Sequence, residues 1–387
     1  MILYRILLTV LVVQIMQLSI FSSLVYSFPG ENGRIVFLSN RDGNDHDIYS
    51  MNANGEDVQQ LTNNAVPEER PSFSPNGRKI VYSSNVTGAG DIYVMDANGE
   101  NKTRITSDPA LEREPNWSPD GDKIIYKKVV NNQDDLWIYS LNTNVHSSFI
   151  ATNATEVAPS WAPDGSVIAF NTRRGSDTQL QIFTINPNGT QETRLTQANG
   201  QNYGPAWSPD STKIAFRSNR EDLSQPDASI YVMNRDGSNQ ERISNLAGDD
   251  RSPSWSPDST KIAFYTNQPN NSGGDSDYDI WVINATNGNN PVNLTANSSA
   301  DDKNPDWGSM PSSTPTHTPE PSNPPTPIPT TAPTNTISPT INDNPWDLNG
   351  DDVVDIYDYS QFILRVESTL DDWDKIIDFI AAFKASP

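Results

Sequence analysis

Five oxygen-bearing side chains near the C-terminus have the spacing of a metal-binding loop. They stand at loop positions one, three, five, nine and twelve: Asp347, Asn349, Asp351, Asp355 and Asp358. Val353 at position seven would add its backbone carbonyl. Ca²⁺ prefers carboxylate and carbonyl oxygens, and this is the spacing of an EF-hand-type loop. The spacing therefore predicts calcium as a cofactor, and the alternative is an acidic turn followed by a helix hairpin.

Apolar residues at helical spacing follow this loop in two groups. The first group is Ile356, Tyr359, Phe362, Ile363 and Val366, and the second is Trp373, Ile376, Ile377, Ile380 and Phe383. We therefore predict a small α-helical calcium module over residues 344–387.

A second set of polar residues stands just before six copies of a Pro-x-Trp or Pro-x-Phe sequence. Its members are Glu69, Arg70, Glu112, Arg113, Glu114, Glu156, Tyr203, Asp250, Arg251, Asp301 and Asp302. If the fold brings the six places together, the acids and arginines could hold a cation or the basic segment of a partner. The alternative is a solvated rim without a ligand.

The elements that position these residues are internal repeats. PSWSPDSTKIAF from Pro253 has close copies that begin at Pro71, Pro115, Pro159 and Pro205, and a short copy, PDW, at Pro305–Trp307. Successive copies are 44 to 52 residues apart. Periods of this length indicate a repeat architecture.

Each repeat predicts four antiparallel strands with no helix between them. The Ser-Pro-Asp-Gly segment suits a tight turn, and Asn-Gly or Asp-Gly marks a later hairpin. Four-stranded units repeated around a ring are propeller blades. The first unit, from Gly33, lacks a Pro-x-Trp strand, and Pro305–Trp307 would supply it from the other end of the chain. We therefore predict an all-β, six-bladed propeller over residues 33–309 whose closure hides its edge strands.

The tryptophans of the repeat permit two interpretations. They are Trp117, Trp161, Trp207, Trp255 and Trp307. Aromatic rings can stack on sugars, but one fixed place in every repeat is typical of packing between neighbouring blades. We predict packing.

Composition excludes several classes of function. The 387 residues carry a net charge of −23, which argues against a nucleic-acid surface. The absence of cysteine excludes disulfides and thiolate chemistry. Three histidines without a recognisable catalytic motif give no catalytic residue to predict.

The two ends carry further segments. Residues 1–27 have the positive start and apolar run of a secretory signal, with an uncleaved membrane anchor as the alternative. After cleavage no transmembrane span would remain. Residues 310–343 form a Pro/Thr/Ser-rich linker, typical of an extended stalk.

The repeat motifs resemble those of the TolB-like, or WD-like, β-propeller family over about residues 33–307. The resemblance implies six blades that bind proteins, peptides or small ligands outside the cytoplasm. The segment Asp347–Asp358 is similar to the first half of a type I dockerin, which implies calcium and a cohesin-type partner. It departs from that pattern at loop position six, where Asp352 replaces glycine, and in lacking a second calcium loop.

Together these features predict an exported, non-enzymatic binding or scaffold protein that is secreted, periplasmic or held at the cell surface. The mouth of the propeller channel would bind a protein, peptide or small ligand, and the C-terminal module would attach the chain. The alternative is a polysaccharide-active enzyme or carbohydrate-binding component of a cellulosome-like assembly.

Overall fold

The computed structural model describes residues 31–310 except 44, 89, 198–199, 222–226 and 269–276. The chain divides into two compact units, Met1–Thr316 and His317–Pro387, and every described residue belongs to the first. The predicted signal at 1–27, the linker beyond Met310 and the calcium module at 344–387 lie outside the described residues. Among the described residues, no helix is long and apolar enough to cross a membrane.

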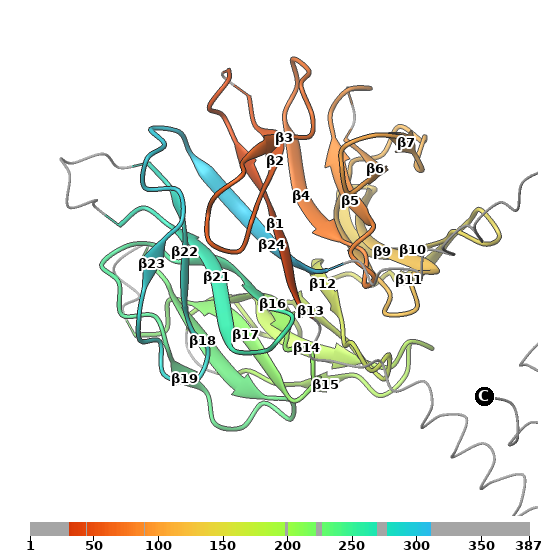
Figure 1. Cartoon of the computed structure of the whole chain (residues 1–387). Helices are drawn as coiled ribbons and strands as arrows, with labels where there is room; N and C mark the ends of the chain where they lie inside the picture. The colour runs from red at the N-terminus through yellow and green to blue at the C-terminus, as the bar shows by residue number, and fades with distance from the viewer. Residues whose placement is uncertain are drawn as a thin grey trace, which may run out of the picture. The chain divides into compact units, whose positions relative to one another are not determined.

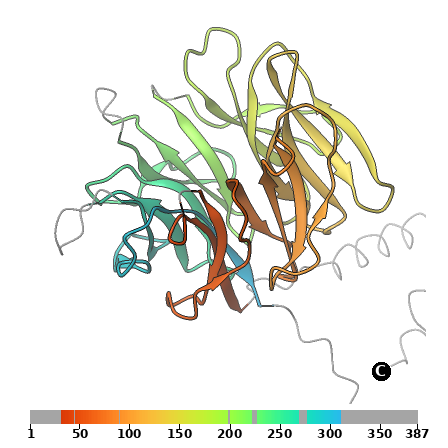
Figure 2. The same cartoon turned by 90° about the horizontal axis from the view of Figure 1, so that it is seen from above.

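Six four-stranded antiparallel sheets follow one another around a ring (Figure 1 and Figure 2). Blade 1 contains β24 (Asp302–Ser309), β1 (Asn32–Ser39), β2 (Asp47–Met51) and β3 (Gln59–Gln60). Blade 2 contains β4 (Glu68–Phe73), β5 (Lys79–Ser84), β6 (Asp91–Asp96) and β7 (Thr103–Arg104). Blade 3 contains β8 (Glu112–Trp117), β9 (Lys123–Val130), β10 (Gln133–Ser140) and β11 (Val145–Ile150).

The other three blades repeat this order. Blade 4 contains β12 (Glu156–Trp161), β13 (Ile168–Thr172), β14 (Gln181–Ile185) and β15 (Thr193–Arg194). Blade 5 contains β16 (Asn202–Trp207), β17 (Lys213–Ser218), β18 (Ser229–Asn234) and β19 (Glu241–Arg242). Blade 6 contains β20 (Arg251–Trp255), β21 (Lys261–Thr266), β22 (Asp279–Asn284) and β23 (Val292–Asn293). The prediction of six four-stranded blades is confirmed.

Blade 1 is built from both ends of the propeller, as the repeats predicted. Strand β24 pairs antiparallel with β1, and Ile35 lies opposite Trp307 in this pairing. Figure 1 shows β24 in blue beside β1 in red. The last strand therefore joins the first blade and closes the ring, and β1 is paired on both sides.

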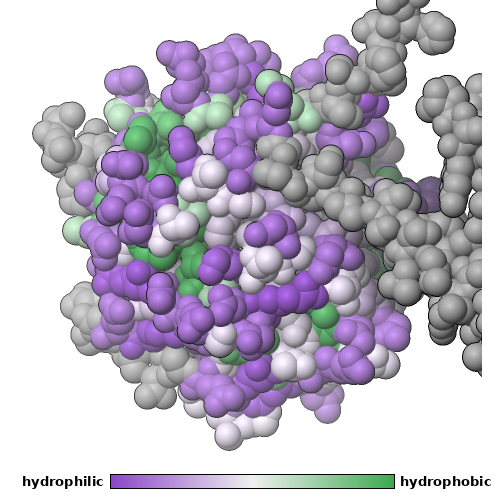
Figure 3. Space-filling model, turned by 60° about the horizontal axis from the view of Figure 1, so that its bottom comes forward, coloured by the Kyte–Doolittle hydropathy of each residue, from purple (hydrophilic) through white to green (hydrophobic). Residues whose placement is uncertain are grey.

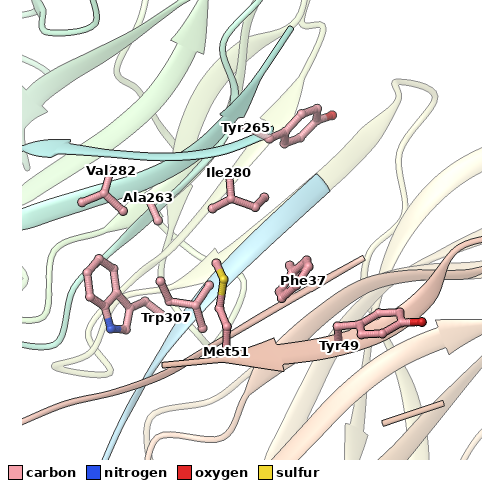
Figure 4. Packing of buried hydrophobic residues seen from close by; sticks show 9 residues of the cluster. Phe37, Tyr49, Met51, Ala263, Tyr265, Ile280, Val282 and Trp307 are labelled. Carbon is pink, nitrogen blue, oxygen red and sulfur yellow. The ribbon is translucent and has the colours of Figure 1, made fainter. Parts of the chain in front are cut away.

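Apolar side chains fill the space between neighbouring blades. Between blades 6 and 1, Trp307 packs with Met51 and Ile35 of blade 1 and with Ile280 and Val282 of blade 6. Figure 4 shows these side chains meeting between the two sheets. The five predicted tryptophans are each 6–8% exposed, so the prediction that they pack between blades is confirmed.

In blades 2 to 6 a polar turn links the innermost strand to the next strand of the blade. In blade 3, Gly121 donates its N–H to the Ser118 carbonyl and Asp122 donates its N–H to the Asp120 carboxylate. Gly121 has φ of 74°, which glycine adopts without strain. This explains the Ser-Pro-Asp-Gly sequence. The face drawn in Figure 3 is largely hydrophilic, with small and separate apolar spots.

The outermost strands differ from the prediction in one respect. Five of them are two residues long and are followed by a Leu/Ile-Thr/Ser pair, with which the last strand of each repeat was predicted to end. The pair nevertheless has a fixed role, since Leu61 is buried and the hydroxyl of Thr62 accepts the N–H of Ile48 at 2.8 Å. In blade 3 the outermost strand, β11, has six residues.

Candidate functional site

A cavity of about 290 Å³ lies on the axis of the ring. Its wall comes from the six innermost strands, β4, β8, β12, β16, β20 and β24, and from the Ser-Pro turns that follow most of them. Residues from all six blades therefore converge on one space, as the channel prediction required.

The innermost strands share a local distortion at their second or third residue. The pairing register shifts there in every blade, which is the signature of a β-bulge. The residues at the bulge all have φ between 47° and 65°, and they are Arg70, Glu114, Ala158, Gly204, Ser252 and Asn304. Five of them are the third residue of their strand, and Ser252 is the second residue of β20, which begins one position later. For a residue other than glycine this conformation costs on the order of 1–2 kcal/mol. All six line the cavity, so the bulge turns this residue toward the channel.

Two of these residues at the bulge are charged, and they meet a tyrosine across the channel. The hydroxyl of Tyr203, on blade 5, donates to Glu114 Oε1, on blade 3, at 2.9 Å. Glu114 Oε2 also accepts the N–H of Ala158 at 2.7 Å. The Arg70 guanidinium, on blade 2, lies 5.9 Å from the centre of the Tyr203 ring and contacts Ser252 Oγ of blade 6 at 3.4 Å. We call Arg70, Glu114 and Tyr203 the channel triad.

The charges of the triad support each other. Burial by itself would raise the pKa of Glu114, but the charges of Arg70 and Lys127 and the bonds from Ala158 and Tyr203 outweigh it and lower that pKa. Burial by itself would lower the pKa of Arg70, but electrostatic interactions with Tyr203 and Glu114 outweigh burial and raise that pKa. The glutamate and the arginine are therefore both charged at neutral pH, although each is partly buried.

Four other predicted residues form ion pairs near the beginnings of the innermost strands. Arg113 pairs with Glu69 at 2.8 Å. Arg251 Nε donates to Asp249 at 2.6 Å, and Lys303 pairs with Asp301 at 2.6 Å. The acids and arginines expected at this mouth are therefore paired with charges of the opposite sign.

The remaining predicted acids lie inside the blades. Glu112, Glu156, Asp250 and Asp302 are each at most 1% exposed, and none belongs to the cavity wall. Each is the residue at or next to the start of an innermost strand, where the side chain points toward the preceding blade. A ligand in the channel would not reach them without movement of the fold.

Sequence reasoning missed the polar side chains deeper in the wall. Asn116 Oδ1 accepts the Trp161 N–H at 2.9 Å, Ser254 Oγ accepts the Trp307 N–H at 3.0 Å, and Asp306 Oδ2 accepts the Phe73 N–H at 2.7 Å. Each bond joins one blade to the next. The signal was the middle residue of Pro-x-Trp or Pro-x-Phe, which is small or polar in every copy.

Two of the three histidines lie among the described residues, and neither belongs to the cavity wall. The described residues also contain no group of three or more His, Cys, Asp or Glu side chains that could hold a metal ion. The predicted calcium ligands from Asp347 to Asp358 lie outside the described residues, so calcium binding stays a prediction.

Known structures share this fold. TolB from Acinetobacter baumannii superposes with a TM-score of 0.62 at 21% identity, over 73% of this chain and 69% of its own. A protein from Agrobacterium tumefaciens described as a TolB has a TM-score of 0.55 at 20% identity, and the match covers 73% of this chain and 100% of that protein. A chain of a nidogen/laminin complex has a TM-score of 0.57 at 9% identity, and the match covers 71% of this chain and 98% of that chain. No curated protein matches the chain.

The family model of the TolB β-propeller domain matches residues 20–176 and 94–273, which together make up well over half of the sequence. Its repeats are the same blades that the structure arranges around the cavity. The chain belongs to the TolB β-propeller family.

Proposed function

We propose that this chain is an exported scaffold protein that binds a segment of a partner protein in the propeller channel. Membership of the TolB family suggests a protein-binding scaffold. Of the structures that share the fold, one belongs to a complex between two proteins, nidogen and laminin. TolB-like proteins are periplasmic, which agrees with export through the N-terminal segment.

The channel triad carries the proposal. The ring does not require charged residues at the bulge, because blades 4, 5 and 6 have Ala158, Gly204 and Ser252 at the same position. Blades 2 and 3 instead hold Arg70 and Glu114 in a strained conformation, partly buried and charged. Strained, desolvated charges of this kind are concentrated at binding sites, where they are preorganised for a ligand.

The chemistry of the triad favours a peptide with both a carboxylate and hydrogen-bond donors. Arg70 would bind the carboxylate, because a guanidinium presents paired donors. Glu114 would accept donors from the peptide. The rim cations Arg113 and Arg251 would exchange their present partners for acids of the same segment.

The second part of the proposal is attachment through the C-terminus. Asp347, Asn349, Asp351, Asp355 and Asp358, with the carbonyl of Val353, would hold Ca²⁺ and order the helices that follow. The dockerin-like module would then attach the propeller to a cohesin-type partner. No observation among the described residues favours the alternative of a polysaccharide-active enzyme.

Affinity selection tests the channel proposal. Peptides selected from a random displayed library against the full-length protein are measured against the parent, Arg70→Ala and Glu114→Gln. The structure accepts alanine at the bulge, since Ala158 has φ of 49°, so Arg70→Ala should fold. We expect at least about a tenfold loss of affinity, because one charge-assisted hydrogen bond contributes about 1.5–3 kcal/mol.

The control is Arg34→Ala, which removes an arginine whose ion pair with Asp57 is partly exposed and away from the cavity wall. This variant should bind the selected peptides as the parent does. Peptides that bind Arg70→Ala and Glu114→Gln with the parent's affinity would refute the proposed site.

A further inference from the structure

The first residue of each innermost strand, or the residue just before the strand, meets the preceding blade at a buried junction. This residue is an acid in five junctions and an amide in one: Glu68, Glu112, Glu156, Asn202, Asp250 and Asp302. All six are at most 1% exposed. A buried carboxylate needs a cation or several hydrogen-bond donors, because burial without them is costly.

Four junctions obtain a cation from the chain itself. Arg41 donates to Asp302 at 2.9 and 3.1 Å, and Lys128 pairs with Glu112 at 3.1 Å. Arg174 Nη1 donates to Glu156 Oε1 at 2.5 Å, and Arg220 Nη2 donates to Asn202 Oδ1 at 2.5 Å. The three arginines share one place in the repeat, two residues after the last residue of the second strand of their blade.

The junction between blades 1 and 2 has no such cation but provides three donors instead. Glu68 accepts hydrogen bonds from Asn64 Nδ2 at 2.6 Å, from the Thr62 hydroxyl at 2.8 Å and from the Ser84 hydroxyl at 3.0 Å. Its carboxyl group is therefore satisfied within the protein.

The junction between blades 5 and 6 has neither solution. Gln268 stands where blades 1, 4 and 5 have arginine, two residues after Thr266 at the end of β21. Both carboxylate oxygens of Asp250, the Thr266 hydroxyl and Gln268 Oε1 are buried and have no hydrogen-bond partner of good geometry among the described residues. The Ser244 and Thr266 hydroxyls nevertheless lie beside the carboxylate, where they lower its pKa and partly offset the effect of burial.

The charged groups near Asp250 already have partners. Asp249 accepts from Arg217 at 3.1 Å and from Arg251 at 2.6 Å. Among the described residues, Arg242 is a cation whose charge acts on Asp250, and it donates to Glu221 and to the Ser244 carbonyl, each at 2.8 Å. Burial raises the pKa of Asp250 to about 7, so above neutral pH the carboxyl group is ionised without a counter-charge.

We propose that the junction between blades 5 and 6 binds a small, oxygen-liganded metal cation at Asp250, in the place that arginine fills in the neighbouring junctions. The two Asp250 oxygens, Thr266 Oγ1 and Gln268 Oε1 are hard ligands of the kind that Ca²⁺ and Na⁺ prefer, with water completing the shell. The ion would neutralise the buried carboxylate of blade 6 beside Ser244, which follows the last strand of blade 5, and so stabilise the ring. This inference is independent of the peptide-binding proposal.

Thermal unfolding of the full-length protein tests the site. The background carries Asp347→Ala and Asp351→Ala, so that the predicted C-terminal loop does not contribute. Unfolding is followed by tryptophan fluorescence at about pH 8 with CaCl₂ or NaCl, and choline chloride keeps the ionic strength constant. At ten times the dissociation constant we expect Tm to rise by about 2–4 °C with one of the two metals.

Two variants identify the site. Asp250→Asn should lose the response to metal. Gln268→Arg supplies the missing cation covalently, so its Tm without metal should exceed that of the background and should not rise further with metal. If Asp250→Asn does not fold, Gln268→Arg decides the question alone.

The proposal is overturned if neither metal raises Tm in the background or if choline raises it equally. It is also overturned if Gln268→Arg responds to metal as the background does.

Discussion

Glu68 should make the stability of the propeller depend on pH. It lies at the junction between blades 1 and 2 and is 1% exposed. Burial raises its pKa from 4.5 to about 7, although hydrogen bonds from Asn64, Thr62 and Ser84 oppose the shift. An acid whose pKa is raised on folding stabilises the protein fully below its unfolded pKa, and that contribution is lost as the pH rises through the folded pKa.

The magnitude follows from the shift. Each pKa unit corresponds to about 1.4 kcal/mol, so a shift from 4.5 to about 7 gives roughly 3 kcal/mol in total. Between about pH 5 and pH 8 the part lost is on the order of 2–3 kcal/mol. Glu68→Gln keeps a neutral side chain of the same shape. Between pH 5 and pH 8 the free energy of unfolding of Glu68→Gln should therefore fall less than that of the parent. The difference between the two decreases should be about 2–3 kcal/mol.

Urea unfolding followed by tryptophan fluorescence at the two pH values measures the difference. The control is Glu241→Gln, which replaces an exposed glutamate in β19 and should leave the pH dependence of the parent unchanged. If parent and Glu68→Gln lose the same stability between pH 5 and pH 8, the assignment of a raised pKa to Glu68 is wrong.

Three further changes test other parts of the molecule. Trp307→Ala should lower the free energy of unfolding by about 3–5 kcal/mol, because it removes packing between the first and last blades, and an unchanged Tm would contradict closure by β24. Asp306→Leu should cost about 1–3 kcal/mol in urea unfolding because the Phe73 N–H loses its acceptor, whereas Asp306→Asn should cost less. Asp352→Gly should tighten calcium binding by the full-length chain in calorimetry, since loop position six favours a positive φ; equal or weaker binding would contradict the loop assignment.

The repeats made the architecture predictable. The period of the Pro-x-Trp motif predicted the six blades, and the missing strand before Gly33 predicted that Pro305–Trp307 would complete blade 1. The fixed place of the tryptophans predicted their packing. These features depend on local patterns that recur six times, so each copy supports the same interpretation.

The site was predicted less well because neighbouring residues on a strand face opposite sides. Glu112, Arg113 and Glu114 were taken as one group, but the structure places Glu112 in the blade junction, Arg113 in a rim ion pair and Glu114 in the channel. The β-bulge at the third residue decides this division. Only Gly204 and Asn304 are residues that favour a positive φ, whereas Arg70, Glu114 and Ala158 are not, so the sequence offered no consistent local signal for the bulge.

The pairing of Tyr203 with Glu114 was also beyond sequence reasoning. The two residues are 89 positions apart and belong to blades that are not adjacent. Only the closed ring brings them across the channel. The same holds for Gln268, whose significance becomes visible only when its position is compared with Arg41, Arg174 and Arg220 at the other junctions.

The most direct test of the central claim is a crystal structure of the full-length protein with the tightest peptide from the selection. The account predicts that the peptide lies in the axial cavity, with a carboxylate bound to Arg70 and with Glu114 accepting a hydrogen bond from the peptide. The proposal would be contradicted by a peptide that binds on the outer strands and leaves the axial cavity empty. In that case the contact between Tyr203 and Glu114 would be unchanged.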